Sequence, residues 1–151
     1  MQVSRRVDYA LRALAYLAGQ PHGRVVGRAE IETRQGIPHS FLAKILRRLV
    51  DAGLLESVAG ARGGFRLRRA ATEISVGAAY EAVEGALRVI DCLQGDVCRF
   101  EPVCGQHDVW RGAQQRLRAY LDGISIAALA DPRGLRAQVA PAGAAAPRAA
   151  K

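Results

Sequence analysis

Hydrophobic positions in the first 70 residues follow the periods of three short helices. Apolar residues recur at helical spacing over residues 5–18, and Ser4 stands where a helix cap is expected. Shorter helical patterns cover residues 28–35 and 38–52. Gly36 lies between these two, where a tight turn needs a positive φ. The pattern therefore predicts a helix followed by two helices joined by a sharp turn.

The hydrophobic pattern then changes to short strands. Residues 54–58 and 65–67 resemble two strands, and the glycine-rich segment 60–64 separates them. Three helices followed by a glycine-tipped hairpin is the order of a winged helix-turn-helix, so we expect a mainly α fold with a small β-hairpin wing.

Three more helices are expected further along the chain, at residues 75–84, 108–121 and 125–130, with Ser75 as a cap. Residues 91–106 are interrupted by Cys, Gly and Pro and should form a loop. The expected organisation is a DNA-binding domain (1–70), a loop with a long C-terminal helix (71–130) and an Ala/Pro/Gly-rich, disordered tail (131–151).

Positive charge is concentrated in the predicted winged helix. The chain has a formal net charge of +8, and residues 1–70 hold 13 Lys+Arg against 5 Asp+Glu. Residues 71–151 hold 9 of each kind and are neutral. A polyanion such as DNA would therefore bind the first half.

The helix after Gly36 should contact DNA bases in the major groove. Ser40 and Lys44 are one turn apart and could face the groove together, while Arg47 and Arg48 lie further along, where phosphate contacts are expected. The outward positions that we assign to DNA binding are His39, Ser40, Lys44, Arg47 and Arg48.

The hairpin supplies a second predicted DNA contact. Gly63 and Gly64 would allow close approach to the sugar–phosphate backbone, and Arg62 at the tip could enter a minor groove. Without the preceding helices, an ordinary hairpin turn would explain the same residues.

The chain has three cysteines, in the pattern Cys92-x5-Cys98-x5-Cys104. An odd number of cysteines without an export signal argues against a disulfide framework. Thiolates bind soft metals and iron–sulfur clusters, and gaps of five residues are wider than zinc sites usually show. We therefore predict an iron–sulfur cluster, 4Fe-4S or 2Fe-2S, with free redox-active thiols as the alternative.

Three thiolates leave one ligand position open, and two residues compete for it. His107 follows Cys104 by three residues, and imidazole can ligate iron–sulfur clusters. Asp8 is at the edge of the first helix's apolar stripe, where a carboxylate needs a partner. A salt bridge from Asp8 to Arg5 or Arg12, and a solvent-facing His107, are the structural alternatives.

Several stretches resemble the Rrf2 family of winged-helix regulators, which includes IscR-like and NsrR-like members. The matching stretches are DYALRAL at 8–14, RQGI at 34–37, GGFRL at 63–67, EISVG at 73–77, EAVEG at 81–85 and the cysteine loop. The resemblance covers the chain to about residue 130. Residues 8–14, 89–92 and 101–104 are closer to the NsrR-like members.

The resemblance implies a homodimer whose long C-terminal helices pair antiparallel. It also implies that the three cysteines ligate an Fe–S cluster whose state alters operator binding in response to nitric oxide, redox state or iron supply. An Asp at the place of Asp8 completes the site from the other subunit in NsrR-like members. In IscR-like members, a His at the place of His107 completes the site. The expected function is a transcriptional regulator that acts as a repressor and is NsrR-like rather than IscR-like.

Two positions depart from the family pattern. Ala59 stands where the wing often has an arginine that contacts DNA, and Arg62 would have to compensate. Glu32 stands where helix-turn-helix packing usually has a small residue. The larger Glu32 side chain would change the angle between the two helices.

Other classes of protein are less compatible with the sequence. No run of 18 apolar residues predicts a membrane span, and the basic N-terminus lacks the apolar core of a signal peptide, so a cytoplasmic location is expected. No nucleophile with a paired base, phosphate loop or carboxylate pair suggests an enzyme. The rivals are a metal-free thiol sensor that binds DNA and a redox protein without a specific DNA target.

Overall fold

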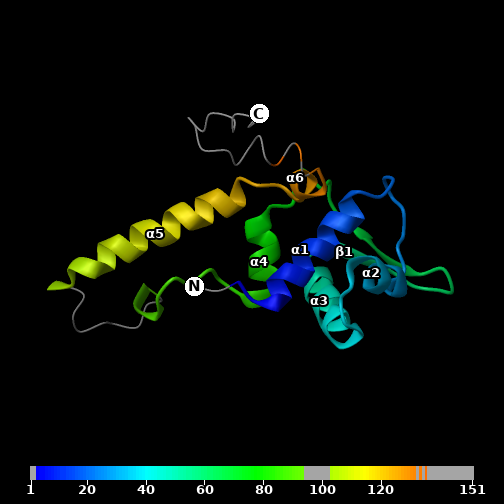
Figure 1. Cartoon of the computed structure of the whole chain (residues 1–151), viewed down its shortest axis with the longest axis horizontal. Helices are drawn as coiled ribbons and strands as arrows, with labels where there is room; N and C mark the ends of the chain where they lie inside the picture. Colours follow the sequence, from blue (N-terminus) through cyan, green and yellow to red (C-terminus); the bar gives the residue numbers. More distant parts are fainter. Residues whose placement is uncertain (1–2, 94–102, 132, 134, 136–151) are drawn as a thin grey trace, which may run out of the picture.

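The computed structural model describes residues 3–93, 103–131, 133 and 135, without the side chain of Cys92. The elements in chain order are α1 (Arg5–Ala18), α2 (Arg28–Gln35), α3 (His39–Asp51), β1 (Leu55–Val58), β2 (Gly64–Leu67), α4 (Val76–Glu84), the 3-10 turn η1 (Asp91–Leu93), α5 (Gly105–Asp122) and α6 (Ile126–Ala130) (Figure 1). The mainly α fold with a β-hairpin wing is confirmed.

Helix α1 is the central element of the core. The Ser4 hydroxyl accepts a hydrogen bond from the Val7 amide, as the sequence predicts for a cap. The inward face of the helix is buried through Val7, Ala10, Ala13, Leu14 and Leu17. It packs against α2, α3, α4, α6 and β2. Most of the fold is therefore built on one helix.

The second and third helices form the predicted helix-turn-helix. Gly36 ends α2 with φ of +59°, in the left-handed region that favours glycine. Pro38 precedes α3 as its N-terminal flanking residue rather than lying in its first turn. The predicted apolar stripe of α3 is buried, and its members are Leu42, Ile45, Leu46 and Leu49.

The hairpin pairs β1 and β2 antiparallel, with Leu55 opposite Leu67 and Val58 opposite Gly64. Val26, before α2, adds a third segment through reciprocal backbone hydrogen bonds of 2.9 Å with Phe65. A Cβ atom at Gly64 would lie 2.2 Å from the Val26 carbonyl oxygen. The hairpin can dock on this segment only because residue 64 has no side chain.

Helix α5 extends away from the body of the molecule, as Figure 1 shows. Its C-terminal end is fixed to α4, because Arg118 lies 2.6 Å from Glu81 and a Cβ on Gly77 would collide with Asp122. The helix begins at Gly105, three residues before the predicted start. Among the described residues, no helix has both the length and the apolar character needed to span a bilayer.

We predict that Gly64→Ala destabilises the protein by about 1–3 kcal/mol, because its methyl group would overlap the Val26 backbone. Gly19→Ala is the matched control, since a Cβ there meets its neighbours only at an ordinary 3.6 Å. The control should change the free energy of unfolding by no more than about 0.5 kcal/mol. Urea denaturation at one protein concentration measures both, and equal losses in the two variants would refute the packing argument.

Candidate functional site

The outward face of α3 carries the residues predicted to contact bases. Ser40 and Lys44 are both exposed, on the side of the helix away from the buried stripe. His39 is the first residue of the helix, and its side chain is 65% exposed. The structure thus leaves these three side chains accessible to a ligand in front of α3.

The two arginines near the end of α3 have different environments. Arg47 is exposed and lies 3.4 Å from Asp51, one turn further along the helix. Arg48 donates a hydrogen bond to the backbone carbonyl of Val83 in α4. In the free protein Arg48 therefore links α3 to α4, a contact that the sequence could not indicate because 35 residues separate the partners.

A basic groove of about 530 Å³ adjoins this face of α3. Its lining residues come from the start of α1, from α3 and from α4, and are Ser4, Arg5, Arg6, Ser40, Phe41, Lys44, Ile45, Arg48 and Val83. The sequence does not indicate that Arg5 and Arg6 lie beside α3, because they belong to a helix more than 30 residues earlier in the chain. The groove places positive charge from α1 beside that of α3, although the two helices are far apart in sequence.

The wing presents Arg62 at an exposed position in the turn between β1 and β2. Gly60 in this turn has φ of +111°, which disfavours other residues. A Cβ at Gly63 would lie 2.3 Å from the Val58 carbonyl oxygen. Gly63 is thus required by packing within the hairpin and Gly64 by the contact with Val26, apart from any role in binding DNA.

Of the three predicted cysteine ligands, the structure describes the side chain of Cys104 alone, since Cys98 lies outside the described residues. Cys104 is a free, half-buried thiol immediately before α5. The backbone of Cys92 lies in η1, which packs along α5, and the Val89 amide donates to Gln114 of α5 at 3.0 Å. The chain segments on both sides of the cysteine loop therefore meet on one helix.

The two candidates for the fourth ligand lie on different helices. His107 is in the first turn of α5 with its side chain 12% exposed, and its Nδ1 lies 2.6 Å from Arg111 Nη2. Asp8 on α1 is 55% exposed and lies 3.5 Å from Arg12, one of the two salt-bridge partners expected for it. In Figure 1 the start of α5 is the end farthest from α1. Among the described side chains there is no group of three His, Cys, Asp or Glu residues that could hold a metal ion.

Arg12 connects the Asp8 side chain to the helix-turn-helix. Besides its ion pair with Asp8, it donates a hydrogen bond to the carbonyl of Gln35, at the turn before α3. Its guanidinium also lies 5.8 Å from the centre of the Tyr9 ring, and Tyr9 packs edge-on against Phe41 of α3. Arg12 therefore links the Asp8 carboxylate to the turn that precedes α3.

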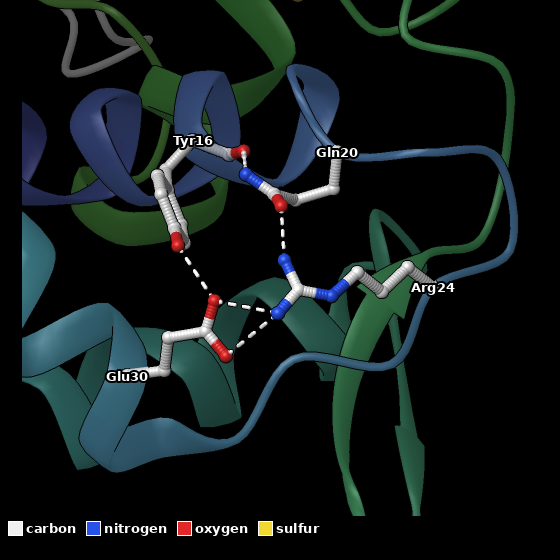
Figure 2. A network of polar contacts seen from close by, with 4 residues as sticks. All are labelled: Tyr16, Gln20, Arg24 and Glu30. Carbon is white, nitrogen blue, oxygen red and sulfur yellow. Dashed lines mark hydrogen bonds and ion pairs between the residues drawn. The ribbon is translucent and has the colours of Figure 1, made fainter.

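A network of polar contacts fixes α2 against α1, as Figure 2 shows. The Tyr16 hydroxyl donates to Glu30 Oε1 at 2.7 Å, and Arg24 Nη2 lies 2.9 and 3.1 Å from the two Glu30 oxygens. Gln20 joins the group by donating to the Tyr16 carbonyl and accepting from Arg24. The network ties α1 and the segment after it to the first turn of α2.

The network shifts two protonation equilibria in opposite directions. The hydrogen bond from Tyr16, and then the charge of Arg24, lower the pKa of Glu30 below its ordinary value. The same hydrogen bond, followed by partial burial, raises the pKa of Tyr16. Both shifts reflect one hydrogen bond, which favours a charged carboxylate beside a neutral phenol.

Comparison with known families gives one match that covers most of the chain. The family model "Rrf2: Iron-dependent Transcriptional regulator" matches residues 3–132. Among individual relatives, the HTH-type transcriptional regulator IscR of Aliivibrio salmonicida is 34% identical over 129 residues, covering 85% of this chain and 77% of that protein. The HTH-type transcriptional regulator NsrR of Halalkalibacterium halodurans is 35% identical over 123 residues, covering 80% and 82%.

Solved structures show the same fold. IscR of T. potens superposes with a TM-score of 0.69 at 27% identity, covering 93% of each chain. The oxidised form of Staphylococcus aureus CymR superposes with a TM-score of 0.68 at 26% identity, covering 87% of this chain and 97% of that one. CymR of B. subtilis gives 0.71 at 21% identity, covering 86% and 96%, and supports the fold alone.

We predict that Glu30 makes the stability of the protein depend on pH in the acid range. Its lowered pKa means that its contribution is complete above the unfolded-state pKa, about 4.5, and is lost as the pH falls through the lower folded-state value. Wild type should therefore exceed Glu30→Gln in free energy of unfolding at pH 6, and the difference should shrink towards about pH 3. A pH series of urea denaturation curves measures it, with Asp51→Asn as the exposed control, and a difference that does not change with pH would contradict the assignment.

Proposed function

Because the chain belongs to the Rrf2 family of transcriptional regulators, we propose that it is a DNA-binding repressor, NsrR-like rather than IscR-like, controlled by an iron–sulfur cluster. The observation that carries the proposal is the joint exposure of Ser40 and Lys44 on α3 beside the basic groove of α1. Such a surface matches a recognition helix with flanking phosphate contacts. The cluster and its signal rest on the cysteine pattern and on the IscR and NsrR relatives.

In this proposal α3 enters the major groove with His39, Ser40 and Lys44 towards the base edges. Arg47 on α3 and Arg5 in the basic groove contact phosphates, and Arg6 would do so by exchanging its ion pair with Glu84 for one with DNA. Arg62 of the wing reaches the neighbouring minor groove. Arg48 would join the phosphate contacts only by exchanging its hydrogen bond to Val83 for one to DNA. This extends the contact set predicted from sequence by two residues of α1.

We assign the exposed apolar side of α5 to a second copy of the chain. Val109, Trp110 and Tyr120 are all exposed on this helix, and none of its residues is buried. A helix that projects from the body with such a face needs a partner to cover it. An antiparallel α5 pair would give a homodimer with two recognition helices, as a two-fold operator requires.

The donor set around α5 fits an iron–sulfur cluster. Cys104 offers a free, half-buried thiol at the start of α5, and the turn that holds Cys92 packs on the same helix. Bound through Cys92, Cys98 and Cys104, such a cluster would supply a centre that reacts with nitric oxide or oxidants. The ligand thiolates would hold the loop ends against α5.

Both candidates for the fourth ligand have support. His107 is one helical turn from Cys104 and little exposed, so it would complete a site within one subunit. Asp8 is exposed on α1, far from the start of its own α5, so it would ligate from the other subunit of the dimer. The choice decides whether the cluster lies within a subunit or joins two.

Residues of the chain itself can relay a change in the cysteine loop to α3. The end of α4, which leads into that loop, is held by α1 through hydrogen bonds from Ser4 at 2.5 Å and Arg6 at 3.1 Å to Glu84. Arg48 of α3 holds the neighbouring Val83 carbonyl. A shift of the loop would therefore move the end of α4 relative to α1 and α3. In a dimer this would change the distance between the two recognition helices, and with it the affinity for the operator.

A metal-free thiol sensor is the second candidate. The free Cys104 thiol favours it, as does the similarity to a CymR structure in an oxidised form. It predicts that peroxide reversibly changes operator binding by iron-free protein. Under the cluster proposal, iron-free protein should not respond in this way.

We predict that Lys44→Ala weakens binding to an operator duplex by about 10- to 100-fold, and that it relaxes specificity at one position of each half-site. The duplex is one enriched from a random DNA library by the wild-type protein. Arg133→Ala is the control, because it removes the same charge from an exposed residue outside the groove. Electrophoretic mobility shifts at two salt concentrations measure the effect. Equal losses in both variants would show only a general charge effect.

We predict that protein purified without oxygen, or reconstituted with iron and sulfide, is coloured, and that Cys104→Ser abolishes the colour and the bound iron. Asp8→Ala and His107→Ala should differ, since only the true ligand is needed for full iron retention. Asp51→Ala is the matched carboxylate control. Iron, sulfide and absorbance with and without nitric oxide are measured. Colourless wild-type protein after reconstitution would exclude the cluster, and two unaffected variants would exclude both ligand candidates.

A further inference from the structure

Glu32 places a carboxylate at the contact between α2 and the recognition helix, where a small residue is usual. Its side chain is only 21% exposed. Its Oε1 atom is cut off from solvent and has no well-directed hydrogen bond among the described residues. A buried carboxylate oxygen without a donor is costly, so this position requires an explanation.

Two basic groups lie close to that oxygen. Nδ1 of His39 is 2.9 Å away, and Nε of Arg28 is 3.3 Å away. Arg28 is four residues before Glu32 on the same helix, whereas His39 is the first residue of α3. The pair with His39 therefore joins the carboxylate to the residue that begins the recognition helix.

The contact with Glu32 determines which ring nitrogen of His39 carries the proton. A carboxylate accepts and cannot donate, so a hydrogen bond to it requires the proton of His39 on Nδ1. In the neutral ring, Nε2 is then an acceptor. With its side chain 65% exposed, His39 can turn slightly to align Nδ1–H with Glu32 while Nε2 stays towards solvent.

We propose that Glu32 is a positioning residue for a base contact made by His39. It fixes the tautomer in which Nε2 accepts a hydrogen bond from an exocyclic amine, N6 of adenine or N4 of cytosine, in the major groove. An unprotonated Nε2 cannot donate to a phosphate, which separates this role from a backbone contact. The inference rests on the proposed function, because it requires α3 to enter the major groove.

The experiment is selection from a random-sequence DNA duplex library at pH 8, where an imidazole is ordinarily neutral. Wild type should prefer adenine or cytosine about tenfold at one position of each half-site. His39→Ala should lose that preference and keep the others. Glu32→Ala should lose the same preference, although residue 32 itself makes no contact with DNA. Glu32→Gln retains an acceptor oxygen and should keep the preference. Glu32→Leu, with similar bulk and no acceptor, is the second test should Glu32→Ala fail to fold, as monitored by circular dichroism.

The outcomes separate this inference from the function on which it rests. If wild type enriches no sequence, sequence-specific DNA binding itself fails. If wild type enriches a motif that His39→Ala leaves intact, only the base contact is overturned. A uniform loss on all sequences with a shallower salt dependence would make His39 a phosphate contact and would likewise overturn the inference. Folded Glu32→Ala and Glu32→Leu proteins that keep the preference would overturn the positioning role.

Discussion

The burial of one face of α1 is the constraint on which the rest of the structure depends. Ala10, Ala13 and Leu14 have no exposed surface, and the two alanines allow neighbouring helices to approach closely. The buried stripe of α3 packs into the same core as this face. Since a helix that buries one stripe must present the opposite one, the packing on α1 fixes which residues of α3 face outwards.

The outer side of α1 makes polar contacts with three other parts of the molecule. Arg12 reaches the turn before α3, Arg6 reaches the end of α4, and Tyr16 reaches α2. Of these contacts only the one between Arg6 and Glu84 is an ion pair, and polar contacts near the surface contribute much less to stability than the core does. They can be exchanged without disturbing the buried face. The fold therefore separates a rigid inner surface from an outer one whose contacts can be rearranged at little cost.

Local sequence signals predicted most of the fold. The Ser4 and Ser75 caps and the glycine turn before α3 depend only on residues close by in the chain. The local sequence is therefore enough to predict them. The start of α5 was placed three residues too late, because Cys104 flanks the helix without a side-chain capping bond. The reason for Gly64 is also tertiary, since the colliding atom belongs to Val26. The candidate site shows the same contrast between local and tertiary determinants. Helical periodicity predicts which residues of α3 are exposed, whereas the position of Arg5 and Arg6 beside α3 depends on how α1 and α3 pack together.

The attachment of α5 to α4 determines what a dimer could transmit. The absence of a side chain at Gly77 leaves room for Asp122, at the end of α5. Two backbone hydrogen bonds of 2.8 Å, from Val76 to Ile124 and from Ile126 to Ile74, then hold the segment after α5 against the start of α4. The other end of α4 is held by α1 and α3. In the proposed dimer, α4 would thus be the connection between the α5 pair and each recognition helix. Half-site spacing would then depend on the packing of α4 against α1. Residues 85–90 are all that separates the end of α4 from the cysteine loop.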